Sequence, residues 1–307
     1  MKVLVATDGS EASWTAVRLA GALAWPAGSL VRVVSVVDAG TALFGGPWPT
    51  AALVQADEIQ AGLRAVADRA LRDAAAALAR PGIEVETTLL EGRPAIAVVD
   101  EADRIGADLI IAGSRGHGTL ETMLLGSVTA ELLDQARIPV MVARRLIAQR
   151  AVLAWDGSEG AEAAARIVES WPAFRSIPVR VVTVLASAAP WWAASSDPGA
   201  PTMIPAILDA IDAERDERRA QNVAMTERLR AAGLAAEGVV RDGDPAGQLI
   251  DAATADLADL IVMGTHGRSG LARLALGSVA RNVVTHAPCT VLVVRAPAAP
   301  EETAGRP

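Results

Sequence analysis

The chain carries one glycine pattern twice, with the same internal spacing and in the same sequence context. The two copies are Gly113-Ser-Arg-Gly116 followed after nine residues by Gly126-Ser127, and Gly264-Thr-His-Gly267 followed after nine residues by Gly277-Ser278. The second copy begins 151 residues after the first, a spacing that chance rarely repeats. The 307 residues therefore predict two related domains of about 150 residues, each long enough to bury its own core.

Strand-like and helix-like segments alternate along both halves. Each glycine pattern follows a short apolar run, residues 107–113 and 258–264, that is typical of a buried parallel strand, and it precedes a helix starting near Ser127 or Ser278. This alternation predicts an α/β fold of two tandem doubly wound domains, each with a five-stranded parallel sheet. Ligands of such folds bind at the carboxyl ends of the strands. We place the domains at residues 1–146 and 147–296, followed by a disordered tail at 297–307.

A strand, a glycine-rich loop and a helix N-terminus in succession are typical of an anion-binding site. Glycine lets the backbone approach a phosphate closely, and the unpaired N–H groups of the first helical turn point at it. For either copy taken alone, glycines of an ordinary tight turn are the alternative. Two copies with matched spacing and context favour nucleotide binding.

The pattern G-x2-G-x9-G-[ST] resembles the ATP-binding signature of the universal stress protein family. The chain resembles the tandem two-domain members of that family over nearly its whole length. The resemblance implies an adenine nucleotide alpha hydrolase-like fold, one ATP site per domain with Mg²⁺ carried by the nucleotide, and a regulatory role in the stress response. It also implies that the last strands of the two domains, near residues 140–143 and 290–294, pair with each other, and it leaves homodimer formation open.

The same resemblance assigns the residues of each nucleotide site. The phosphate and ribose contacts that it implies are Gly113, Gly116, Gly126, Ser127 and Val128 in the first domain, and Gly264, Gly267, Gly277, Ser278 and Val279 in the second. Asp8 and Asp156 each end a first strand and would accept a hydrogen bond from a ribose hydroxyl or the adenine amine; a turn or helix-capping aspartate is the alternative. Val36 and Val184 match the adenine-contacting valine of the family, whereas the sequence alone would place both in the core.

Charge and composition exclude several functions. A formal net charge of -8 and a pI near 5.0 argue against binding to nucleic acid or to an acidic membrane surface. No long uncharged apolar run or signal peptide is apparent, so we expect a cytoplasmic protein. Lys2 is the only lysine, which excludes a Walker-type phosphate loop. No histidine or cysteine spacing indicates a metal site, and Cys289 is expected to be a buried, inert thiol.

The two halves differ at positions that bear on ligand affinity. The first loop contains Arg115, His117 and Glu121, and the second contains His266, Arg268 and Arg273, with Ala272 in the place of Glu121. Because a guanidinium neutralises phosphate oxygens and an acid repels them, we expect the second site to hold a triphosphate more tightly. Trp155 stands where the first half has Thr7 and is expected to narrow the second adenine pocket. We interpret the charged run at 214–219 as a solvated helix face.

Two other functions stay open. A slow ATP hydrolase or nucleotidyl transferase on the same fold would need a positioned base or a lysine at the phosphates, and the sequence assigns no catalytic residue. An interaction module whose loops no longer bind nucleotide would show no thermal shift with ATP. A regulatory role also requires a protein partner, which the sequence does not identify.

Overall fold

The described residues form two halves of the same architecture. The computed structural model describes residues 1–38, 51–116, 125–186, 200–267 and 276–296. In chain order the first half contains β1 (Lys2–Ala6), α1 (Glu11–Ala22), β2 (Ser29–Val37), α3 (Ala51–Leu78), β3 (Ile83–Glu91), α4 (Pro94–Ile105), β4 (Leu109–Gly113), α5 (Ser127–Gln135) and β5 (Val140–Ala143). The second contains β6 (Ala151–Ala154), α6 (Glu159–Ser170), the short 3-10 helix η1 (Pro172–Ser176), β7 (Val179–Leu185), α7 (Ala200–Ala231), β8 (Ala236–Asp242), α8 (Pro245–Ala255), β9 (Leu260–Gly264), α9 (Ser278–His286) and β10 (Thr290–Val294).

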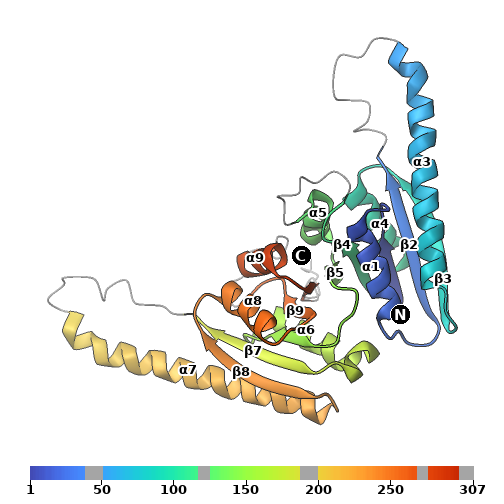
Figure 1. Ribbon diagram of the computed structural model, residues 1–307. Coiled ribbons are helices and arrows are strands. Elements are labelled where there is room, and N and C mark those ends of the chain that lie inside the picture. The colour runs from blue at the N-terminus through green and yellow to red at the C-terminus, as the bar shows by residue number, and fades with distance from the viewer. Residues whose placement is uncertain (39–50, 117–124, 187–199, 268–275, 297–307) are drawn as a thin grey trace, which may run out of the picture.

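The ten strands of the described residues form one sheet, in the order β3-β2-β1-β4-β5-β10-β9-β6-β7-β8. The five strands of each half are parallel, as predicted, and the only antiparallel pair among the described strands joins β5 to β10. Met141 lies opposite Leu292 in that pair. The predicted pairing of the last strands is therefore confirmed, and it places the boundary between the halves in the middle of a continuous sheet (Figure 1).

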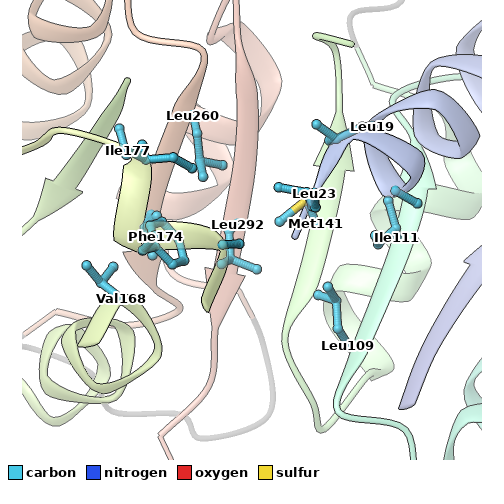
Figure 2. Close-up of a cluster of buried hydrophobic side chains, with 14 of the residues drawn as sticks. Leu19, Leu23, Leu109, Ile111, Met141, Val168, Phe174, Ile177, Leu260 and Leu292 are labelled. Carbon is cyan, nitrogen blue, oxygen red and sulfur yellow. The ribbon is translucent and has the colours of Figure 1, made fainter. Parts of the chain in front are cut away.

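Helices cover both faces of the sheet, and each face has one apolar core that extends through both halves. On one face α1, α3, α6 and α7 pack over alternate strand residues, and on the other α4, α5, α8 and α9 do so. Figure 2 shows part of the first core, with Met141 and Leu292 lying where the two halves meet. Strands buried on both faces explain the near-continuous apolar runs in the sequence.

Two sequence interpretations can be compared with the structure directly. The prolines of residues 185–205 predict a loop that reaches Pro205, but α7 begins at Ala200. Pro201 falls in the first helical turn, where proline is tolerated. Cys289 is fully buried, and burial raises the pKa of its thiol to about 11, as expected for an inert thiol. No helix in the described part of the chain is long and apolar enough to cross a membrane.

One backbone position predicts a stabilising substitution. Leu257, just after α8, has φ of 51°, whereas the first half has Gly106 with φ of 62° at the same place after α4. The Leu257 side chain is 77% exposed, so it contributes little packing that glycine would lose. Because the left-handed region costs a non-glycine residue about 1–2 kcal/mol, Leu257→Gly is expected to raise the free energy of unfolding by about 1 kcal/mol.

Denaturant unfolding measures this effect. The matched control is Leu146→Gly, because Leu146 is also exposed but does not have a positive φ. This substitution should leave the free energy of unfolding unchanged or lower it. Equal effects of the two substitutions would contradict the strain at Leu257.

Candidate functional site

Each half has a cleft at the carboxyl ends of its strands. Cleft 1, of about 610 Å³, lies where β1, β2 and β4 end, and cleft 2, of about 520 Å³, lies where β6, β7 and β9 end. In a doubly wound sheet this edge is where helices on opposite faces diverge, which leaves room for a ligand. Trp155 lines cleft 2, and the narrowing of the adenine pocket by its indole stays a prediction.

The fold brings all seven predicted residues of each half to the lining of one cleft. Cleft 1 is lined by Asp8, Val36, Gly113, Gly116, Gly126, Ser127 and Val128, and cleft 2 by Asp156, Val184, Gly264, Gly267, Gly277, Ser278 and Val279. Val36 and Val184 are half-buried, so each presents an apolar surface to the cleft instead of lying wholly in the core. Contact of these residues with a nucleotide stays a prediction.

The two aspartates serve a local turn and also line the clefts. Oδ1 of Asp8 accepts the Ser10 N–H at 2.9 Å, and Oδ1 of Asp156 accepts the Ser158 N–H at 3.0 Å. The alternative of a turn aspartate is therefore correct for one oxygen of each carboxylate. The second oxygen lies against the glycine loop, because a Cβ on Gly116 would come within 2.6 Å of Asp8 Oδ2.

Backbone contacts explain why glycine is needed in the loops. A Cβ on Gly113 would lie 2.5 Å from the Ala12 carbonyl oxygen, so this glycine lets α1 cross β4 at close range. Gly264 is in the same situation against α6. Gly126 and Gly277 donate N–H bonds to the Ser114 and Thr265 carbonyls, at 2.8 and 2.9 Å. An added Cβ would lie 3.1 Å from the Arg115 Cα in the first loop and 2.6 Å from the Thr265 carbonyl oxygen in the second. These contacts account for the first and third glycines of the pattern without any ligand.

In the described part of the chain α5 and α9, like α4, lack the side-chain N-cap that α1, α6 and α8 have. Ser10 caps α1 and Ser158 caps α6 through side-chain oxygens. By contrast α5 and α9 begin after Gly126 and Gly277, and no side chain of the described residues caps them. The first N–H groups of a helix need an acceptor, so these two N-termini suit an anion.

Hydroxyl groups support the Asp8 turn in the first half. Thr7 Oγ1 and Ser13 Oγ lie 3.2 Å apart, the Gly9 N–H donates to Thr7, and the Asp8 N–H donates to Ser13 at 3.4 Å. All of these residues lie within one short segment, so the support is local in sequence. It holds the strand-to-helix turn from which the Asp8 carboxylate projects.

A remote arginine supports the same turn in the second half. Trp155 and Ala161 take the places of Thr7 and Ser13, and the buried indole N–H of Trp155 has no hydrogen-bond partner among the described residues. Instead Arg218, from α7, donates to the Asp156 carbonyl oxygen at 2.6 Å. The Arg218 guanidinium therefore supports the turn at Asp156, whereas the Thr7 and Ser13 hydroxyls support the turn at Asp8.

Arg218 corrects the interpretation of the charged run on α7. Arg218 pairs with Glu214 at 3.5 Å, but its side chain is only 10% exposed and lines cleft 2 together with Arg215. The face at this position is thus not fully solvated. Counting from the helix-ending glycines, Gly82 and Gly233, the first half has Ala67 at this place. The signal available in the sequence was an arginine that aligns with an alanine of the first half.

Other predicted loop differences are only partly visible. Arg115 lines cleft 1, and His266 lines cleft 2 with its Nδ1 3.2 Å from the Thr265 hydroxyl. His117, Glu121, Arg268, Ala272 and Arg273 lie outside the described residues. Within the described residues no group of three or more histidine, cysteine or acidic side chains is arranged to hold a metal ion.

A tandem pair of doubly wound halves with a glycine-loop cleft in each defines the class of protein, and sequence comparison identifies its family. A model of the universal stress protein family matches residues 1–144 and 148–295. The chain belongs to the universal stress protein family, as a tandem member with two family domains.

Relatives and solved structures agree with this assignment. The chain is 30% identical over 302 residues to Universal stress protein Mb2028c of Mycobacterium bovis, covering 95% of this chain and 96% of the relative. It is 31% identical over 147 residues to Universal stress protein MJ0531 of Methanocaldococcus jannaschii, covering 47% and 82%. The crystal structure of a universal stress protein from Archaeoglobus fulgidus superimposes with a TM-score of 0.66 at 18% identity, covering 96% and 98%, which supports the fold.

Proposed function

We propose that this protein binds ATP, or another adenine nucleotide, in both clefts and acts as a nucleotide-dependent regulator in the stress response. The phosphates would lie at the N-termini of α5 and α9, and the ribose or base would lie near Asp8 and Asp156. Occupancy would favour one conformation or partner surface over another. Mg²⁺ would be carried by the phosphates, since that ion commonly binds through phosphate oxygens and water.

The observation that carries this proposal is the pair of uncapped helix N-termini. In both halves the cleft combines such an N-terminus with a glycine-rich loop and one strand-end aspartate. Oriented N–H groups and a helix dipole favour a phosphate, while the half-buried Val36 and Val184 offer an apolar surface for a base. The arrangement occurs twice, although the turns behind it are supported by different residues.

Fast turnover is not part of the proposal. Efficient hydrolysis needs a base positioned to activate water. Among the described residues, the partner of His266 Nδ1 is the Thr265 hydroxyl. We expect ATP to stay bound or to be hydrolysed slowly, so that nucleotide exchange and not catalysis controls the state of the protein.

Freshly purified protein tests the proposal directly. The protein is denatured, and the released nucleotide is identified by mass and quantified as a molar ratio. We expect an adenine nucleotide at up to two per chain, and two per chain after saturation with ATP and Mg²⁺. Absence of nucleotide, followed by no heat of binding and no thermal shift with ATP and Mg²⁺, would overturn the proposal in favour of a nucleotide-free interaction module.

A further inference from the structure

Helices α5 and α9 each begin at a cleft and end against an arginine of the opposite half. Arg295 directly follows β10 and donates from Nη2 to the Leu133 and Asp134 carbonyl oxygens of α5, at 2.6 and 2.9 Å. Arg144 directly follows β5 and donates from Nη2 to the Val284 carbonyl oxygen of α9 at 2.5 Å. Both the donor and the acceptor positions are 151 residues apart between the halves. The same contact is therefore made twice, crosswise over the β5–β10 pair.

These arginines satisfy groups that a helix cannot satisfy itself. The last four carbonyls of an α-helix have no intrahelical partner. In α5 the Ala136 N–H takes the Leu132 carbonyl, and Arg295 takes the next two. A cation also interacts favourably with the negative end of the helix dipole. Burial lowers the pKa of Arg144 and of Arg295, which agrees with guanidinium groups enclosed between the halves.

The crosswise contacts connect the two clefts through short, stiff elements. Helices α5 and α9 have nine residues each, about 13 Å from end to end. Their first residues, Ser127 and Ser278, line the clefts, while their last turns are held by the other half. In addition the Thr265 N–H of the second glycine loop donates to the carbonyl of Val294, the residue before Arg295, at 2.9 Å. The second glycine loop is thus bonded to Val294, and helix α5 is bonded to the next residue, Arg295.

We propose that Arg295 and Arg144 are positioning residues for the opposite clefts. Arg295, from the second half, seats α5 for a nucleotide in cleft 1, and Arg144, from the first half, seats α9 for a nucleotide in cleft 2. Each half thereby completes the phosphate site of the other. This inference rests on the proposed nucleotide binding and adds an exchange of support between the halves.

The last turn of α5 carries a negative charge that the last turn of α9 lacks. Asp134 places a carboxylate in the last turn of α5, where the helix dipole disfavours negative charge. Its side chain accepts from Arg281 at 2.7 Å and lies 3.4 Å from the Leu276 N–H, both of the second half. In α9 the equivalent residue is Thr285, which is uncharged. Cleft 1 should therefore depend on Arg295 more strongly than cleft 2 depends on Arg144.

The test requires one working cleft at a time. In the Gly267→Trp background only cleft 1 is open, and in the Gly116→Trp background only cleft 2 is open, because each tryptophan fills one loop. Arg295→Met and Arg144→Met are introduced into both backgrounds, and each protein is titrated with ATP and Mg²⁺ by calorimetry. We expect Arg295→Met to weaken cleft 1 by about three- to tenfold, and Arg144→Met to weaken cleft 2 by somewhat less. In each case the cleft in the arginine's own half should change less than twofold.

Two controls separate positioning from general loss of stability. Arg295→Lys keeps a cation with several donors and should restore most of the affinity of cleft 1. Arg166→Met removes an exposed arginine paired only with Glu162 among the described residues, and should leave both clefts unchanged. Weakening of both clefts equally, or of the arginine's own cleft, would overturn the inference.

Hydrogen exchange measured without nucleotide tests the role of the two arginines separately from nucleotide binding. Arg295→Met should speed exchange in the peptide covering 127–136, and Arg144→Met in the peptide covering 278–287, each without affecting the other peptide. If wild-type protein binds no ATP, the proposed function fails, and the exchange pattern alone decides whether the arginines hold the opposite helices. Unchanged exchange in both peptides would show that they do not.

Discussion

Gly264→Ala is expected to lower the free energy of unfolding by about 3 kcal/mol or more, a large part of the roughly 5–15 kcal/mol that stabilises a typical domain. A Cβ on Gly264 would lie 2.5 Å from the carbonyl carbon and 2.7 Å from the Cα of Gly160. The obstructing atoms are backbone atoms of α6, which cannot rotate away, so the helix must move off the sheet. The effect should be measured by denaturant unfolding, followed by circular dichroism.

Gly62→Ala is the matched control for this prediction. Gly62 is an exposed residue inside α3, with nothing within 4 Å of an added Cβ. There alanine should stabilise the helix by about 0.5–1 kcal/mol. A free energy of unfolding of Gly264→Ala equal to that of wild type would show that α6 and β9 do not approach this closely.

Gly116→Trp is expected to abolish nucleotide binding in cleft 1 and to leave one nucleotide per chain. The indole would enter the space between the glycine loop and Asp8, because even a Cβ comes within 2.6 Å of the carboxylate. Gly267→Trp should do the same in cleft 2, where a Cβ comes within 2.7 Å of Asp156 Oδ2. Loss of the oriented N–H contacts and of the space for phosphate corresponds to at least a hundredfold loss of affinity.

The two variants also compare the remaining clefts. We expect Gly116→Trp, in which cleft 2 stays open, to bind ATP more tightly than Gly267→Trp, because Arg215 and Arg218 line cleft 2 where the first half has Arg64 and Ala67. The exposed substitution Val223→Trp controls for an added tryptophan and should keep both sites. Equal affinities in the two blocked variants would contradict the difference between the clefts.

Much of the architecture is determined by patterns that lie close together in the sequence. Apolar runs ending in glycine predict the buried strands. Ser10 and Ser158, which cap α1 and α6, are of a residue type that commonly caps helices. The repeat at 151 residues predicts that the second half has the same order of strands, loops and helices as the first. Because all parallel strands of a half end at one edge, residues predicted separately had to meet in one cleft.

Tertiary structure alone decided how those elements are held. Arg218 supports a turn 62 residues away, and Arg295 holds a carbonyl 162 residues away. Side-chain reach over such separations depends on helix placement, which periodicity does not encode. The requirement for glycine at position 264 likewise depends on tertiary structure, because it arises from the close packing of α6 against this residue. The sequence by itself determined the two α/β halves and the residues of their clefts, because strand patterning and turn chemistry are local; packing across the sheet decided which residues support each cleft, because those contacts exist only once the chain has folded.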